Sequence, residues 1–158
     1  MKTLEAATPA SKFTLIQKVL VAVDLSEQSE ATATYAAELA KCFGAPLTLV
    51  HVHDPVPLYE YAGETTCTMI DEQREDLEKL LDELTQKVRK LGLVCRSLFL
   101  DGDPAEQISA LASDIDADLI VTGSRPSTFL GSLFSQHKAT QIMHRAPCPV
   151  LVYHQKDC

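Results

Sequence analysis

Residues 18–30, KVLVAVDLSEQSE, decide the fold because they join a buried strand to a helix. The stretch from Lys18 to Asp24 is a run of β-branched and apolar residues, which is typical of a strand covered on both faces. Ser26 offers a side-chain oxygen as a helix N-cap, and Glu27 falls in the first turn, where the helix dipole favours a negative charge. This turn predicts the first unit of an alternating α/β fold.

The rest of the chain continues the same alternation. Further strands are predicted at residues 47–53, 94–100, 119–122 and 150–153, separated by amphipathic helical segments at 70–91, 103–115 and 139–146. The strand at 94–100 is less uniformly apolar and is expected at an edge. Asp103-Pro104-Ala105-Glu106 has the composition of a helix start, with Asp at the N-cap and Pro at the first helical position. Strict alternation predicts a five-stranded parallel sheet with right-handed crossovers and helices on both faces.

Length and composition predict one globular domain. The chain has 158 residues, of which 46% are hydrophobic and 23% charged, and about 150 residues is the usual size of one domain. We expect residues 1–15 to be a flexible extension and residues 16–156 to form the domain. No run of 18 apolar residues is present, and the first residues lack the apolar core of a signal peptide, so a cytoplasmic protein is expected.

The charge balance and the cysteines exclude several function classes. The 14 basic and 22 acidic residues give a net charge of −8, which repels phosphate backbones and anionic lipids, so neither nucleic acid nor a membrane is expected as a partner. The five cysteines are odd in number and form no C-x-x-C pair, which argues against the common zinc and thioredoxin patterns. Reduced thiols are predicted.

Polar residues follow the first and fourth strands, where a doubly wound sheet binds its ligands. Asp24 ends the first strand, and Gly123-Ser124-Arg125-Pro126 follows the fourth. A carboxylate at the position of Asp24 either accepts hydrogen bonds from a ribose hydroxyl or satisfies the amides of its own loop. Both interpretations stay open from the sequence. Ser26 lacks the G-x-S-x-G elbow and a positioned base, so no catalytic residue is assigned.

Three segments together resemble the universal stress protein family. They are VAVDLSEQSE at 21–30, IVTGSR at 120–125 and APCPVLV at 146–152, and the resemblance extends from Lys18 to His154. It implies a Rossmann-like α/β sandwich of the adenine nucleotide alpha-hydrolase type, with strand order 3-2-1-4-5. It also implies a cytosolic homodimer, and many members of the family bind ATP.

The chain departs from the ATP motif of that family. The motif is Gly, two residues, Gly, nine residues, Gly, then Ser or Thr, and these positions fall on Gly123, Pro126, Gln136 and His137. Only the first matches, so the chain resembles the branch with a degenerate ATP-binding motif. No resident cofactor is expected, and ATP or AMP is the candidate ligand.

A second interpretation keeps a nucleotide in the crevice through side chains. Arg125, His137 and Lys138 would contact the phosphates in place of backbone amides. Val52 and Thr122 would line a slot for the base. The candidate nucleotide-binding residues are therefore Asp24, Val52, Thr122, Gly123, Arg125, His137 and Lys138.

The resemblance also predicts how the protein associates and acts. The apolar strand at 150–153 would be an edge strand, and an exposed apolar edge needs a partner. We expect a homodimer with Val150 and Val152 near the two-fold axis, and a protein partner whose identity the sequence does not reveal. The predicted function is a regulatory stress-response protein without enzymatic activity, although slow nucleotide hydrolysis stays open. The alternative is an adenine-nucleotide binder.

His51 and His53 lie two residues apart on a predicted strand and therefore share a face. With Asp54 they could begin a metal site. The sequence places no further ligand beside them, so no metal is expected.

Overall fold

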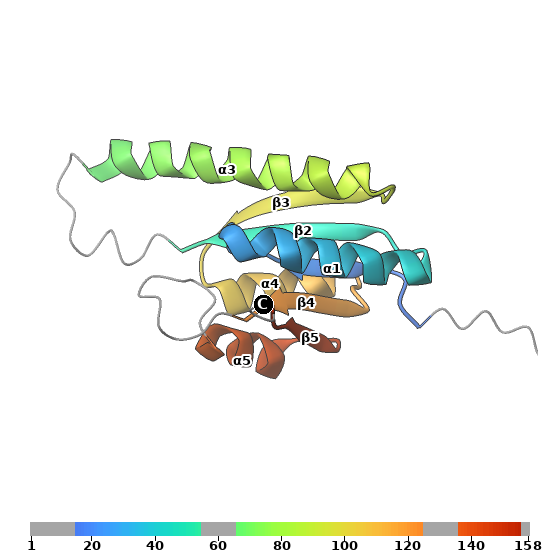
Figure 1. Cartoon of the computed structure of the whole chain (residues 1–158). Helices are drawn as coiled ribbons and strands as arrows, with labels where there is room; N and C mark the ends of the chain where they lie inside the picture. Colours follow the sequence, from blue (N-terminus) through green and yellow to red (C-terminus); the bar gives the residue numbers. More distant parts are fainter. Residues whose placement is uncertain (1–14, 55–65, 125–135, 156–158) are drawn as a thin grey trace, which may run out of the picture.

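The computed structural model describes residues 15–54, 66–124 and 136–155, and at 66–72 and 136–137 it describes the backbone alone. Five parallel strands form one sheet in the order β3-β2-β1-β4-β5 (Figure 1). The order and the parallel pairing predicted from the sequence are confirmed. The elements are β1 (Val19–Ala22), α1 (Glu27–Phe43), β2 (Leu47–His53), α3 (Thr66–Lys90), β3 (Cys95–Asp101), α4 (Pro104–Asp114), β4 (Leu119–Gly123), α5 (Gln136–Arg145) and β5 (Val150–Tyr153).

β1 lies at the centre of the sheet because every residue in it is apolar. Val21 pairs with Leu49 of β2 on one side and with Val121 of β4 on the other. All four residues of β1 are buried, which agrees with a strand covered on both faces. β3 and β5 are the two edge strands, as the less uniform apolar pattern of the third strand indicated.

Helices cover both faces of the sheet, and the alternation along β1 separates two hydrophobic clusters. The odd-numbered valines of β1 pack with α1 and α3, and Leu20 and Ala22 pack with α4 and α5. The first cluster includes Ala33, Ala36, Ala37 and Ala40 of α1 with Leu81, Leu84 and Val88 of α3. The second includes Ile108 of α4 and Ile142 of α5. The fold thus has three layers, helix, sheet and helix.

The carboxyl ends of all five strands face the same way, toward the left of Figure 1. α3 is the longest helix and runs over β3, while α1 crosses in front of β1. β2 and β4 end here at His53 and Gly123, and residues 55–65 and 125–135 lie outside the described residues. Of the predicted extension at residues 1–15, only Leu15 is among the described residues.

Within the described ranges, no helix combines the length and the apolar content that crossing a bilayer requires.

Candidate functional site

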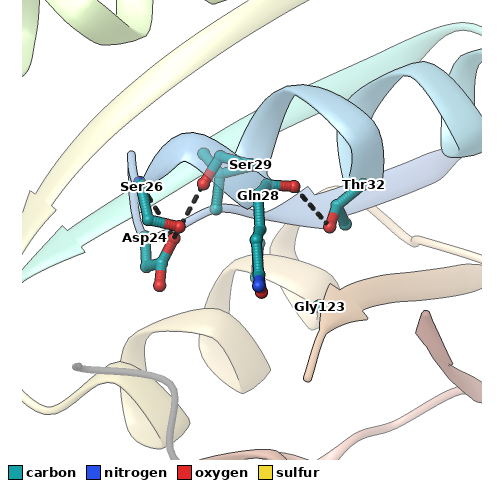
Figure 2. Close-up of a pocket in the computed structure, with 8 residues that line it drawn as sticks. Asp24, Ser26, Gln28, Ser29, Thr32 and Gly123 are labelled. Carbon is teal, nitrogen blue, oxygen red and sulfur yellow. Dashed lines mark hydrogen bonds between the residues drawn. The ribbon is translucent and has the colours of Figure 1, made fainter. Parts of the chain in front are cut away.

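A pocket opens at the carboxyl ends of β1 and β4. The pocket and its open mouth together hold about 260 Å³ of empty space, and Figure 2 shows the polar side chains that surround it. This is the point where the chain order of neighbouring strands reverses, since β1 lies between β2 and β4. The lining residues are Ala22, Val23, Asp24, Ser26, Gln28, Ser29, Thr32 and Gly123.

Asp24 is held in one orientation by three donors. Its Oδ1 atom accepts hydrogen bonds from the backbone N–H of Ser26 at 3.0 Å, from the Ser26 hydroxyl at 2.6 Å and from the Ser29 hydroxyl at 2.7 Å. The two hydroxyl bonds cross from the end of β1 to the first turn of α1 (Figure 2). A carboxylate that receives three hydrogen bonds is fixed in position. It also lies beside the helix N-terminus, which favours negative charge.

Ser26 occupies the N-cap position of α1 as predicted, but the predicted side-chain cap is wrong. Its side chain makes no hydrogen bond to the helix amides. The hydroxyl instead donates a charge-assisted hydrogen bond to the Asp24 carboxylate. The interpretation of Asp24 as a residue that satisfies its own loop is therefore shown, and the same contacts set its side chain at the pocket.

The backbone conformation of Leu25 allows the hydrogen bonds between Asp24 and Ser26 to form. Its φ of 60° lies in the left-handed region, which is unusual for a residue with a Cβ atom. The turn at Leu25 brings the side chains of Asp24 and Ser26 together. The leucine side chain packs against the first hydrophobic cluster, and this burial offsets the cost of the backbone conformation. Strained backbone of this kind is concentrated at functional sites.

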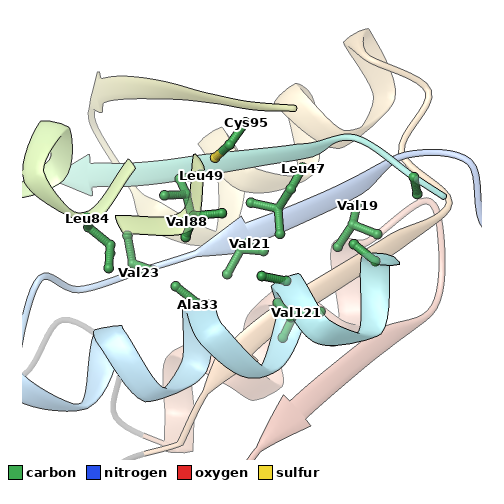
Figure 3. Close-up of a cluster of buried hydrophobic side chains, with 14 of the residues drawn as sticks. Val19, Val21, Val23, Ala33, Leu47, Leu49, Leu84, Val88, Cys95 and Val121 are labelled. Carbon is green, nitrogen blue, oxygen red and sulfur yellow. The ribbon is translucent and has the colours of Figure 1, made fainter. Parts of the chain in front are cut away.

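Gly123 closes the other side of the pocket. A Cβ atom on Gly123 would lie 2.8 Å from the Oγ1 atom of Thr32, which donates a hydrogen bond to the Gln28 carbonyl at 3.1 Å. The glycine therefore lets the end of β4 approach α1. α1 itself lies close to the sheet because alanines face it, including Ala33, which Figure 3 shows beside Val21 and Val23.

Asp24 and Gly123 are the two predicted residues that the structure brings together at the pocket. Val52 and Thr122 are fully buried, and neither lines it. Val52 belongs to the second hydrophobic cluster, and the Thr122 hydroxyl donates to the carbonyl of Gly123 at 3.3 Å. Arg125 lies outside the described residues, and only the backbone of His137 is described.

Lys138 has a different partner from the one predicted. Its Nζ atom donates to Oδ2 of Asp103 at 3.0 Å and so ties α5 to the start of α4. Asp103 also caps α4, because its Oδ1 accepts the N–H of Glu106 at 3.0 Å, as the sequence predicted. The Glu106 N–H and then Lys138 hold the pKa of Asp103 below its ordinary value. In this structure the Lys138 ammonium is thus engaged away from the pocket.

α1 contributes polar residues to the pocket that were not among the predicted site residues. Ser29 and Thr32 are polar residues among the buried alanines of that helix, with exposed fractions of only 5% and 3%. A buried hydroxyl needs a partner, and these two find Asp24 and the Gln28 carbonyl. Polar residues on the apolar face of the helix were the available signal for these positions.

The two histidines share the face of β2 that packs against α1 and α3, as predicted. Nδ1 of His51 lies 2.9 Å from the Val23 carbonyl and donates to it, because a carbonyl oxygen can only accept. Burial lowers the pKa of His51. The Nε2 atoms of His51 and His53 are buried and have no hydrogen-bond partner among the residues that the structure describes, and Phe99 packs beside both rings. Across the described part of the chain, no three metal-binding side chains gather in one place.

Known proteins are similar to this chain in sequence and in fold. The sequence pattern of the universal stress protein family matches residues 15–154. A universal stress protein of Thermus aquaticus is 35% identical over 144 residues, which cover 87% of this chain and 98% of the relative.

Two solved structures from Archaeoglobus fulgidus have the same fold. A universal stress protein with 27% identity superposes with a TM-score of 0.65 and covers 86% of this chain and 92% of its own. A second, solved in complex with dAMP, has 24% identity and a TM-score of 0.63, and covers 87% and 98%. Because the family pattern extends over nearly the whole chain, this protein belongs to the universal stress protein family.

Proposed function

We propose that this universal stress protein is regulatory, and that it binds the nucleoside part of an adenine nucleotide in the pocket at Asp24. AMP or adenosine is the preferred ligand, and ATP binds more weakly. The protein acts through occupancy of the pocket rather than through catalysis. The observation that supports this function is the carboxylate of Asp24, fixed by three donors at a pocket lined with hydroxyl and amide side chains.

The nucleoside end of the ligand suits this pocket because the polar groups there can recognise hydroxyls. A fixed carboxylate accepts hydrogen bonds from sugar hydroxyls without further ordering of its side chain. Figure 2 shows the side chains of Asp24 and Gln28 extending from the α1 side toward the same space. The protein from A. fulgidus that was solved with dAMP shares this fold, and the recognition chemistry proposed here comes from this chain's own residues.

The triphosphate end is disfavoured by the composition of the loop. Pro126 stands where the motif has a glycine and lacks an N–H donor, and Gln136 and His137 stand at the last two motif positions. A missing charge-assisted hydrogen bond costs about 1.5–3 kcal/mol. Lys138 could supply a cation, but only by leaving Asp103. ATP therefore gains little from its extra phosphates.

Calorimetry with adenosine, AMP and ATP tests this function. The wild type should bind AMP at least as tightly as ATP, and Asp24→Ala should weaken AMP binding by about tenfold or more. Asp82→Ala is the matched control, because Asp82 is an exposed carboxylate on α3, away from the pocket. Asp24→Asn retains the shape of the side chain and removes only its charge. It therefore distinguishes weaker binding due to the lost charge from weaker binding due to a rearranged turn. Tight ATP binding that is lost on changing Arg125 or Lys138 would contradict the proposal.

The assembly is part of the same proposal. β5 is an edge strand whose four residues are half-buried within one subunit, which leaves apolar surface for a second copy. We place Val150 and Val152 near a two-fold axis and the dimer in the cytoplasm. Sedimentation velocity should show a dimer at micromolar concentration, and Val152→Lys should shift it toward monomer. Leu80→Lys, at an exposed position of α3, is the control that should leave the dimer unchanged. A wild-type monomer would overturn this assembly.

A further inference from the structure

A second cavity lies at the opposite end of the sheet from Asp24. It encloses about 580 Å³ of empty space, including its mouth, and is formed where β1, β2 and β3 begin. Lys18, which precedes β1, lies on its rim, whereas Asp24 follows β1. Six residues of extended chain separate these two positions by about 20 Å. The cavity is therefore distinct from the nucleotide pocket.

The cavity exists because α4 is too short to cover the sheet. α4 has 11 residues and is about 16 Å long, whereas the seven-residue strands β2 and β3 extend about 23 Å. The helix starts at the carboxyl end of β3 and stops at its C-cap, Ile115, which lines the cavity. Thr48 and Arg96 lie in register with Leu20, on the face that packs against α4 and α5. α4 therefore does not extend over this face beyond Ile115.

The walls of the cavity are apolar. Pro46, Val94 and Ile115 line it with apolar side chains, and Val94 is 78% exposed. Leu47 also lines the cavity, although its side chain belongs to the first hydrophobic cluster, on the other face of the sheet. An apolar chain or ring placed here would remove this surface from water, which is favourable by about 25 cal/mol per Å².

The charged residues of the cavity are both cations, although the chain carries a net charge of −8. Nε of Arg96 donates to the Thr48 hydroxyl at 3.1 Å, which orients the guanidinium. Among the described residues, none accepts a hydrogen bond from the two terminal nitrogens of Arg96. Nζ of Lys18 donates to the carbonyl of Ile115 at 2.9 Å, which uses one of its three protons. Both side chains thus retain N–H groups for an anion.

We infer that this cavity binds a small amphipathic monoanion, such as a medium-chain carboxylate. The apolar chain lies against Pro46, Val94 and Ile115. The carboxylate accepts a forked pair of hydrogen bonds from Arg96, with Lys18 contributing a further charge. Charge complementarity selects an anion over a neutral chain, and the apolar walls select a carboxylate with a tail over a simple inorganic ion. This site is independent of the nucleotide pocket and would respond to a different class of metabolite.

Decanoate, used below its micelle concentration, is the probe. It should displace 8-anilinonaphthalene-1-sulfonate from a single saturable site, and 1-decanol should displace the dye less well. Arg96→Gln should weaken decanoate binding by about tenfold or more. Lys90→Gln removes the same charge from an exposed position at the end of α3 and should leave binding unchanged. Unchanged binding by Arg96→Gln, or equal displacement by decanol, would overturn the inference.

Amide chemical shifts of the wild type provide a test that needs no variant. Addition of decanoate should move the resonances of Thr48 and Arg96 and leave those of Ser26 and Ser29 in place. AMP should not displace the dye. If decanoate moves the Ser26 and Ser29 resonances instead, or if AMP displaces the dye, the ligand occupies the nucleotide pocket and the inference is wrong.

Discussion

A methyl group on Gly123 would lie 2.8 Å from the hydroxyl oxygen of Thr32, so the end of β4 and the second turn of α1 approach so closely that a Cβ atom fits only if Thr32 shifts. This contact brings together two elements that are about 90 residues apart in the chain. It also fixes the width of the pocket between Asp24 and β4.

Replacement of Gly123 by alanine should destabilise the protein by about 1–3 kcal/mol, because the new Cβ atom overlaps the Thr32 hydroxyl. Urea denaturation measures the loss. In a protein that already carries Thr32→Ala, the Gly123→Ala substitution should cost much less stability than it does in the wild type. Thr32→Val is the control, because it retains an atom at the Oγ1 position. In that background Gly123→Ala should cost as much stability as in the wild type. Equal losses in all three backgrounds would show that the contact is unimportant.

Acid should weaken the link between α4 and α5. The pKa of Asp103 is lowered in the folded protein, so the folded state binds this proton less readily than the unfolded state. The contribution of Asp103 is therefore fully present above its unfolded pKa and is lost as the pH falls below about 4 toward the folded value. Asp103→Asn retains a capping side chain and should reduce this loss. Urea denaturation from pH 6 to pH 3 compares the two proteins. If the free energy of unfolding falls equally with pH in both proteins, Asp103 is not the group responsible.

His51 should make stability depend on pH in a higher window. Burial lowers its pKa in the folded state, so the unfolded state takes up the proton first as the pH falls below about 6.5. Stability should then decrease by no more than about 1.4 kcal/mol per pH unit for this one group. His51→Gln, which can still donate to the Val23 carbonyl, should flatten the dependence between pH 7 and pH 5. His144→Gln, at an exposed position of α5, should leave the slope unchanged.

The cysteines should differ in reactivity. Burial raises the pKa of Cys95 to about 11, whereas Cys42 is exposed on α1. Because the thiolate is the reactive form, iodoacetamide at pH 8 should modify Cys42 and spare Cys95 in the native protein. Peptide mass spectrometry reads out both sites, and labelling in urea should make the two equal. Early labelling of Cys95 in the native state would show that β3 opens locally.

The parts of the fold that were predictable are those with a complete local pattern. The bounds of β2 and β5 match the predicted ranges, because apolar runs at both places end abruptly at polar residues or proline. α5 begins at Gln136, three residues before the predicted start, and α3 begins four residues early at Thr66. The helical period of apolar residues in the sequence begins at Ile70 and at Ala139, so periodicity alone does not detect the residues before them.

The candidate site was predictable only where strand ends determine it. Asp24 and Gly123 could be placed together because parallel strands end at one edge. The pairing of Lys138 with Asp103 could not, because it joins two helices across 35 residues. The hydrogen bond from the Ser26 hydroxyl to Asp24 was also not predictable, because it depends on the left-handed turn at Leu25.

The alanines of α1 have a consequence for how this pocket could change in evolution or by design. Ala33 is fully buried against the sheet and directly follows Thr32, the residue that touches Gly123. A larger side chain at Ala33 would move α1 outward and widen the gap between Thr32 and β4. The ligand size that the pocket accepts is therefore inherited from the packing of the core, and it can diverge between relatives whose pocket-lining residues are identical.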